Sequence, residues 1–104
     1  MIKRQIPASH GQLDVKVSTG GPDWVLLLHG KIFTYNDWGP LPDALQAAGC
    51  SVLAIHFAGY GESTGTQDPA LYASDISDAL RWIEQQQPRS IRVIGASMGA
   101  LALL

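Results

Sequence analysis

The sequence has little of several features that would mark a special class of protein. It carries a single cysteine, Cys50, so no internal disulfide can form, as is typical of proteins in a reducing compartment. No apolar run approaches the length of a membrane span, and no apolar segment of a signal peptide follows the N-terminal basic residues. The formal net charge of −2 provides no basic surface for nucleic acid or an anionic membrane. We therefore expect a cytoplasmic protein that binds neither.

The composition is that of an ordinary globular domain, with hydrophobic residues making up 46% of the 104 residues.

The sequence predicts five strands, of which the first two lie near the N-terminus. Residues 1–8 and 13–18 alternate between apolar and polar side chains, which predicts two half-exposed strands joined by a turn at residues 10–12. Three short, mostly apolar runs follow, as expected for central parallel strands covered on both faces. These runs are residues 24–28, 51–55 and 91–94.

Two amphipathic segments between these runs predict the connecting helices. In the first, Gly49 is placed to end a helix whose apolar residues are Trp38, Leu41, Leu45 and Ala48. In the second, Asp68 and Pro69 form a helix start before an apolar stripe of Tyr72, Ile76, Ala79, Leu80 and Ile83. The alternation of strands and helices predicts an α/β fold: a doubly wound, mostly parallel sheet with an N-terminal antiparallel hairpin.

The third apolar run leads directly into a G-x-S-x-G sequence at residues 95–99, followed by small residues that favour a helix. A strand-to-helix turn this tight needs Gly95 and Gly99, because a Cβ at either position would collide with neighbouring backbone. This is the layout of a nucleophile elbow with Ser97 at its tip. A second match contains Ser63, but turn-forming residues rather than a helix follow it, so Ser63 is not predicted to be a nucleophile.

The ends of the three apolar runs carry motifs in a familiar order. His29-Gly30 follows the first run, a G-x-G-x-S sequence at residues 59–63 follows the second, and the elbow follows the third. With this combination the chain resembles the α/β-hydrolase superfamily, in its bacterial esterase-like or dienelactone-hydrolase-like branches. The match covers the chain but only the N-terminal portion of such a domain. Residues 1–104 are therefore expected to form an incomplete α/β-hydrolase fold that ends just after the elbow.

The resemblance implies roles for individual residues. In this family, backbone N–H groups stabilise the oxyanion formed in acyl transfer, and here they correspond to those of Met98 and Lys31. His29, next to Gly30, is expected to organise the loop by hydrogen bonding rather than to act as a base. The implied substrate is a small carboxylic ester or related acyl compound attacked by Ser97. No metal or other cofactor is implied, and nothing specifies an oligomeric state.

The chain departs from the family pattern after its second central run. Members often have an acidic residue where this chain has His56, and arginine or proline where it has Ala58. Those side chains commonly brace the loop. The end of this strand is not the family's base position, so His56 is not predicted to be the catalytic base. His10 is expected to be solvated in a remote turn.

The acid and the histidine of a catalytic triad follow the nucleophile in this superfamily, so both would lie beyond Leu104. Without them Ser97 has no base to activate it, and residues 91–94 would form an exposed, aggregation-prone edge strand. We expect the 104-residue chain alone to be inactive. Two alternatives stay open. One is an inactive remnant or non-catalytic binding module. The other is a nucleotide-binding domain, suggested by residues 59–61, although Thr64 replaces its third glycine.

Overall fold

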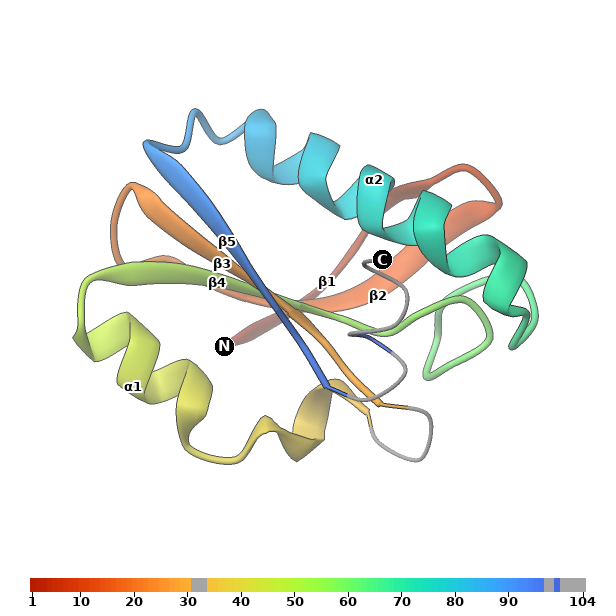
Figure 1. Ribbon diagram of the computed structural model, residues 1–104, viewed down its shortest axis with the longest axis horizontal. Helices are drawn as coiled ribbons and strands as arrows, with labels where there is room; N and C mark the ends of the chain where they lie inside the picture. Colours follow the sequence, from red (N-terminus) through yellow and green to blue (C-terminus); the bar gives the residue numbers. More distant parts are fainter. Residues whose placement is uncertain (31–33, 97–98, 100–104) are drawn as a thin grey trace.

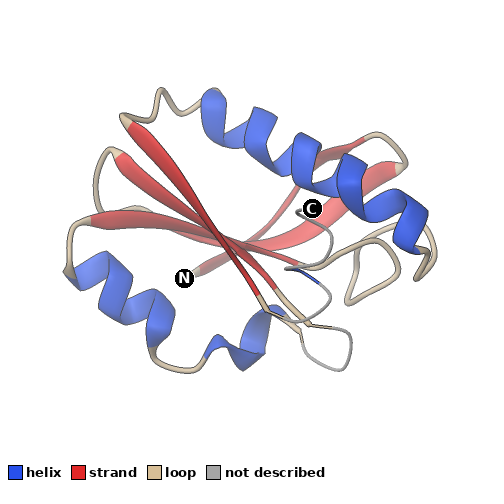
Figure 2. Cartoon of the chain, in the orientation of Figure 1, coloured by secondary structure: helices blue, strands red, loops and turns tan. Residues whose placement is uncertain are grey.

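The computed structural model describes residues 1–30, 34–96 and 99, which form a five-stranded sheet with helices on both faces (Figures 1 and 2). The strand order is β1-β2-β4-β3-β5. The strands are β1 (Ile2–Ala8), β2 (Gly11–Ser18), β3 (Asp23–Leu28), β4 (Cys50–Ile55) and β5 (Ser90–Gly95). The helices are η1 (Tyr35–Trp38), α1 (Leu41–Ala47), η2 (Pro69–Leu71) and α2 (Tyr72–Glu84), of which η1 and η2 are short 3-10 helices.

β3, β4 and β5 are parallel and in register at their carboxyl ends. Leu28 of β3 pairs with Ile55 of β4 on one side and with Gly95 of β5 on the other. The chain therefore leaves each of these three strands at the same end of the sheet. β1 and β2 form an antiparallel hairpin, and β2 also runs antiparallel to β4. The predicted α/β class, with parallel central strands and an N-terminal hairpin, is confirmed.

Both faces of the sheet are covered at β3 and β4, which explains why these two strands are mostly apolar. α2 packs on one face and α1 on the other, on opposite sides of the sheet in Figure 1. Along β3, Leu26 and Leu28 belong to the core under α2, whereas Val25 and Leu27 belong to the core under α1. Burial of a leucine side chain contributes about 1.5–3 kcal/mol, so the alternate side chains of β3 stabilise both layers.

β5 lies at one edge of the described sheet, and β1 lies at the other. The only partner strand of β5 among the described residues is β3, and Ile94 is 38% exposed. No helix within the described part of the chain is long and apolar enough to cross a bilayer.

The connection between β3 and β4 differs from the single predicted helix. Trp38 ends η1, and α1 begins at Leu41. Between them Gly39 has a φ of +58°, and Pro40 follows as the N-cap of α1. The prediction was wrong here because the apolar stripe has helical spacing across a Gly-Pro pair that interrupts the helix. Gly49, with a φ of +94°, lies just after α1 as predicted.

The helix between β4 and β5 follows the predicted pattern. The Asp68 side chain accepts a hydrogen bond from the backbone N–H of Ala70 and caps η2, which leads into α2. Four residues of the predicted apolar stripe are buried in the core, and Leu80 packs against it. Two acidic residues of α2, Asp75 and Asp78, are also buried. Each of them has a partner in the N-terminal hairpin.

The hairpin is longer and more buried than predicted. β2 begins at Gly11, and Ala8 pairs with Gly11, so the turn consists of Ser9 and His10 rather than residues 10–12. From Leu13 onward, every residue of β2 except Lys16 is buried. The prediction of a half-exposed strand was wrong because polar residues of β2 are covered by side chains from later loops.

His10 is not solvated, contrary to the prediction. Its Nε2 lies 2.6 Å from Asp75 Oδ1 and its Nδ1 lies 2.8 Å from Thr64 Oγ1, and the side chain is only 12% exposed. The other oxygen of Asp75 accepts the backbone N–H of Ala58 at 2.8 Å. Ser9 N–H donates to Asp78 at 2.8 Å. The tip of the hairpin is thus attached to α2 and to the loop after β4.

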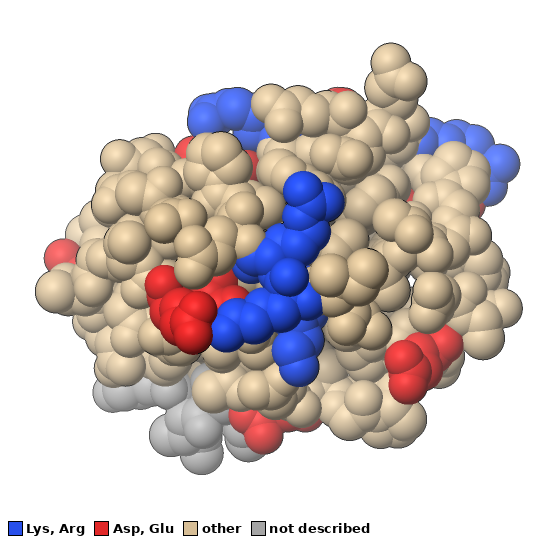
Figure 3. Space-filling view, turned by 180° about the vertical axis from the view of Figure 1, so that it is seen from behind, with Lys and Arg blue, Asp and Glu red and all other residues tan. Residues whose placement is uncertain are grey.

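Charge on the molecular surface is mixed. Figure 3 shows one face on which basic side chains gather directly beside acidic ones. The ion pair between Lys3 Nζ and Glu62 Oε1, at 3.1 Å, is one contact of this kind. An exposed pair of this type contributes at most about 1 kcal/mol.

Candidate active site

The predicted elbow begins and ends against the carboxyl end of β3. Ala96 N–H donates to Leu28 O at 3.0 Å, and Gly99 N–H donates to Ala96 O at 3.0 Å. A Cβ added at Gly99 would lie 2.4 Å from Leu28 O, a distance that backbone atoms cannot accommodate. Glycine is therefore required at this position. Gly95 is the last residue of β5, whereas Ser97, Met98 and Lys31 lie outside the described residues.

His29 joins the ends of β3 and β4. It is buried, its Nδ1 lies 2.8 Å from Gly30 O, and its Nε2 lies 3.1 Å from the backbone nitrogen of Phe57. Nδ1 must carry the proton that is donated to the carbonyl, which leaves Nε2 to accept the Phe57 N–H. Burial lowers the pKa of His29, so the ring is neutral. Both nitrogens are used by the backbone, which leaves His29 no free lone pair for proton transfer.

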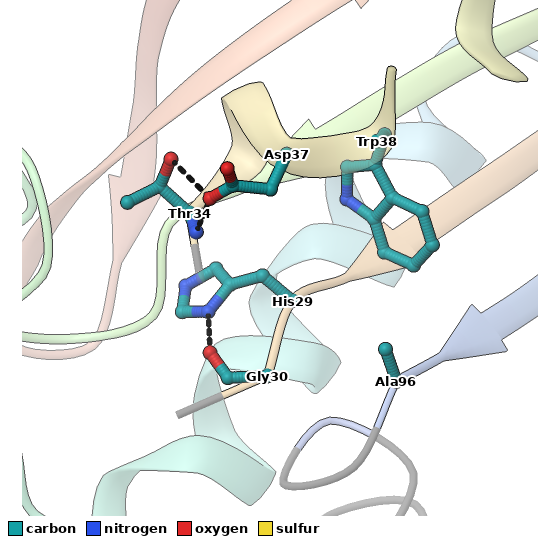
Figure 4. Close-up of a pocket in the computed structure, with 6 residues that line it drawn as sticks. All are labelled: His29, Gly30, Thr34, Asp37, Trp38 and Ala96. Atoms are coloured by element: carbon teal, nitrogen blue, oxygen red, sulfur yellow. Dashed lines mark hydrogen bonds between the residues drawn. The ribbon is translucent and has the colours of Figure 1, made fainter. Parts of the chain in front are cut away.

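A cavity of about 130 Å³ lies beside these strand ends. Its lining residues are His29, Gly30, Thr34, Asp37, Trp38 and Ala96 (Figure 4). Thr34 and Asp37 form a capping box at the start of η1, in which Thr34 N–H donates to Asp37 Oδ2 at 2.6 Å. The cavity wall is mostly apolar, as in many sites for small organic ligands. It is therefore suited to the apolar part of a small molecule.

A buried polar network adjoins η1, and the sequence pattern gave no indication of it. Asp14 of β2 is 1% exposed and accepts three hydrogen bonds. Its Oδ1 accepts the Tyr35 hydroxyl at 3.0 Å, and its Oδ2 accepts His56 Nδ1 at 3.1 Å and the Glu62 backbone N–H at 3.0 Å. The Tyr35 and His56 rings are stacked, with centroids 3.7 Å apart and an interplanar angle of 18°. The network joins β2, β4, η1 and the loop after β4.

The hydrogen bonds determine the charge of this network. Burial raises the pKa of Asp14, but the hydrogen bonds from Glu62, His56 and Tyr35 outweigh burial and hold it below its usual value. Burial lowers the pKa of His56 more than Asp14 raises it. Burial and the hydrogen bond to Asp14 raise the pKa of Tyr35 to about 12. At neutral pH the network thus contains an ionised Asp14, a neutral His56 and a neutral Tyr35.

Ser63, in the second G-x-S-x-G sequence, is part of the same region. Its hydroxyl donates to His56 O at 2.8 Å and accepts the Asp14 N–H at 2.8 Å. Because the Ser63 hydroxyl both donates to and accepts from backbone groups, it connects β2 with the loop after β4. Its arrangement is that of a structural residue, as the sequence context indicated.

The glycines after β4 serve packing within their loop. Gly59 N–H donates to Thr64 O at 3.2 Å, and a Cβ on Gly59 would lie 2.4 Å from Gln67 N. The next helix begins only at Pro69. A dinucleotide site needs a helix N-terminus directly after its glycines, where the phosphates bind. The loop lacks that feature, so its geometry does not favour the nucleotide-binding alternative.

Substitution of Gly61 by alanine is expected to destabilise the protein by about 2–4 kcal/mol, from a positive φ and overpacking together. The added Cβ would lie 2.1 Å from His56 Nδ1 and 2.7 Å from Asp14 Oδ2, and φ at this residue is +52°. Gly49→Ala is the matched control, because Gly49 also has a positive φ but has nothing within 4 Å of its added Cβ. Urea unfolding measures both. Equal losses would show that the network tolerates the added methyl group.

Comparison with known proteins places the chain among hydrolases. The model of the alpha/beta hydrolase family matches residues 25–104. No curated protein sequence matches the chain. The solved structures similar to it include the esterase Pf2001 of Pyrococcus furiosus, with a TM-score of 0.85 and 25% identity over 97% of this chain and 43% of that one.

Two further structures have TM-scores and sequence identities similar to those of the esterase. Epoxide hydrolase A of Mycobacterium thermoresistibile has a TM-score of 0.82 and 25% identity, covering 98% of this chain and 33% of that chain. An alpha-beta serine hydrolase homologue from Coxiella burnetii has a TM-score of 0.86 and 25% identity, covering 97% of this chain and 54% of its own. The chain therefore spans between a third and about half of the length of these structures.

Proposed function

Because this chain belongs to the α/β-hydrolase family, we propose that residues 1–104 are the N-terminal portion of a single α/β-hydrolase domain and that the full-length protein is a serine hydrolase. Its proposed substrates are small carboxylic esters or related acyl compounds. The observation that carries this proposal is the close approach of Ala96 and Gly99 to the end of β3. A turn that requires glycine at this point is what a nucleophile elbow needs.

In the proposed reaction, Ser97 Oγ attacks the carbonyl carbon of the ester. The backbone N–H groups of Met98 and Lys31 donate to the oxyanion of the tetrahedral intermediate. Collapse of the intermediate releases the alcohol and leaves an acyl group on Ser97, which water then removes. A base and an acid from the chain beyond Leu104 would activate the serine and then the water. His29 contributes by holding the ends of β3 and β4 together.

The setting of the site supports a small-molecule substrate. The apolar cavity beside Ala96 can receive the acyl part of an ester. We also propose a cytoplasmic location, in keeping with the free thiol of Cys50, the one cysteine of residues 1–104.

Labelling with a fluorophosphonate probe tests the nucleophile in the full-length protein. We expect one labelled serine, which peptide mapping identifies as Ser97, and no labelling of Ser97→Ala. Ser63→Ala is the matched control because Ser63 is at the centre of the other G-x-S-x-G sequence, and it should label normally. Turnover of p-nitrophenyl butyrate and of styrene oxide then separates an esterase from an epoxide hydrolase. Labelling at Ser63, or turnover of the epoxide alone, would contradict the proposal.

A further inference from the structure

We infer that Tyr35, held by Asp14 and His56, is a positioning residue that sets one wall of the cavity beside Ala96, and that this cavity takes a short acyl chain. The assignment of an acyl chain to this cavity rests on the proposed function, whereas the positioning of the wall by Tyr35 does not.

The cavity wall in question is η1 with its preceding residue. Thr34, Asp37 and Trp38 line the cavity, and they flank Tyr35 in the chain. The capping box fixes Thr34 to Asp37, so this short segment holds its own shape. Tyr35 is the one side chain of η1 that is buried. The position of the wall relative to the sheet therefore depends on Tyr35, together with Trp38, which packs against the core under α1.

Tyr35 is held from two directions. Its ring stacks on His56 at 3.7 Å, and its hydroxyl donates to Asp14 Oδ1 at 3.0 Å. Both partners are themselves buried and fixed, since the second oxygen of Asp14 accepts from His56 and from the Glu62 backbone. Lys16 adds a weaker contact on the surface, with Nζ 5.0 Å from the Tyr35 ring centroid and 2.5 Å from Asn36 Oδ1. The hydrogen bond to an ionised carboxylate is the strongest of these contacts.

The size of the cavity limits what it can hold. An apolar protein cavity of about 150 Å³ accommodates benzene, which has six carbon atoms. The present cavity, at about 130 Å³, is slightly smaller. Trp38 and His29 occupy facing sides of it in Figure 4. An acyl chain of up to about six carbon atoms therefore fits within it, and a longer chain extends beyond its apolar lining.

The test uses the full-length protein and its Tyr35→Phe variant, which keeps the ring but removes the hydroxyl. We expect kcat/KM of the wild type to be at least about 10-fold higher for p-nitrophenyl butyrate than for the octanoate. A hydrophobic pocket discriminates by about this factor when a substrate gains or loses one methylene group. In Tyr35→Phe this ratio should fall at least 3-fold. Tyr72→Phe, which also removes a buried hydroxyl but from α2 on the opposite face of the sheet, should leave the ratio unchanged.

Amide hydrogen exchange of residues 34–38 measures the wall without any substrate. Exchange should be at least about 10-fold faster in Tyr35→Phe than in the wild type and in Tyr72→Phe. Unchanged exchange would overturn the positioning role even if the variant unfolds at a lower temperature. Faster exchange with an unchanged butyrate-to-octanoate ratio would overturn the acyl assignment. If the wild type neither labels nor cleaves esters, the proposed function fails, and the exchange rates still decide the role of Tyr35.

Discussion

Replacement of Ser97 by alanine in the full-length protein is expected to lower kcat for p-nitrophenyl butyrate by about 10⁴-fold or more, as removal of a triad serine does in other hydrolases. The physical reason is the loss of the attacking oxygen, so only binding and the oxyanion donors continue to accelerate attack by water. KM should change little, because the small side chain adds little to substrate binding. Initial rates at saturating ester measure the effect.

Ser63→Ala provides the comparison for this loss of activity. The Ser63 hydroxyl bonds to the backbone of Asp14 and His56, so its removal is expected to destabilise the protein by about 1–3 kcal/mol while kcat of the folded protein stays within a few-fold. A similar loss of kcat in both variants would mean that Ser97 has no special role. Circular dichroism confirms that each variant is folded before its rate is compared.

Substitution of Asp14 by alanine is expected to lower the free energy of unfolding by about 3–5 kcal/mol, because each buried donor left without its acceptor costs about 1–3 kcal/mol. Three donors lose their acceptor, namely the Tyr35 hydroxyl, His56 Nδ1–H and the Glu62 N–H. The Tyr35 and His56 side chains are buried and stacked on each other, so these two donors cannot easily turn to water. Urea unfolding at pH 7 measures the loss.

Asp43→Ala is the matched control for the Asp14 substitution. Asp43 is exposed on α1, and a surface change of this kind is usually within about 0.5 kcal/mol of neutral. A loss below about 1 kcal/mol in Asp14→Ala would show that water replaces the carboxylate, and it would remove the basis for a rigid anchor at Tyr35.

The central layer of the fold could be predicted because its signal is local. β3 and β4 are buried on both faces, and a short continuous apolar run is the direct result of such burial. The break between Trp38 and Leu41 also had a local signal in Gly39 and Pro40. The apolar spacing predicts one helix across that pair, although proline within a helix costs about 3 kcal/mol or more.

The buried polar contacts could not be predicted, because they depend on residues far apart in the sequence. The alternating pattern of β2 assigns Asp14 to the face away from Leu13 and Val15, but it does not specify what covers that face. Tyr35 and His56 cover it, and they come from other elements. The G-x-S-x-G motif does predict the close approach of Gly99 to neighbouring backbone. The role of Ser97 stays a prediction.

The attachment of the hairpin tip to α2 also affects the order in which the chain can fold during synthesis. β1 and β2 can pair as soon as both have left the ribosome, but His10 bonds to Asp75 across 65 positions and Ser9 bonds to Asp78 across 69. At about 5–20 residues per second, the partners of the hairpin emerge several seconds after it. During this interval Leu13 and Val15 have no helix to cover them. Completion of α2, rather than formation of the hairpin, thus sets the earliest time at which the N-terminal strands become protected from other nascent chains.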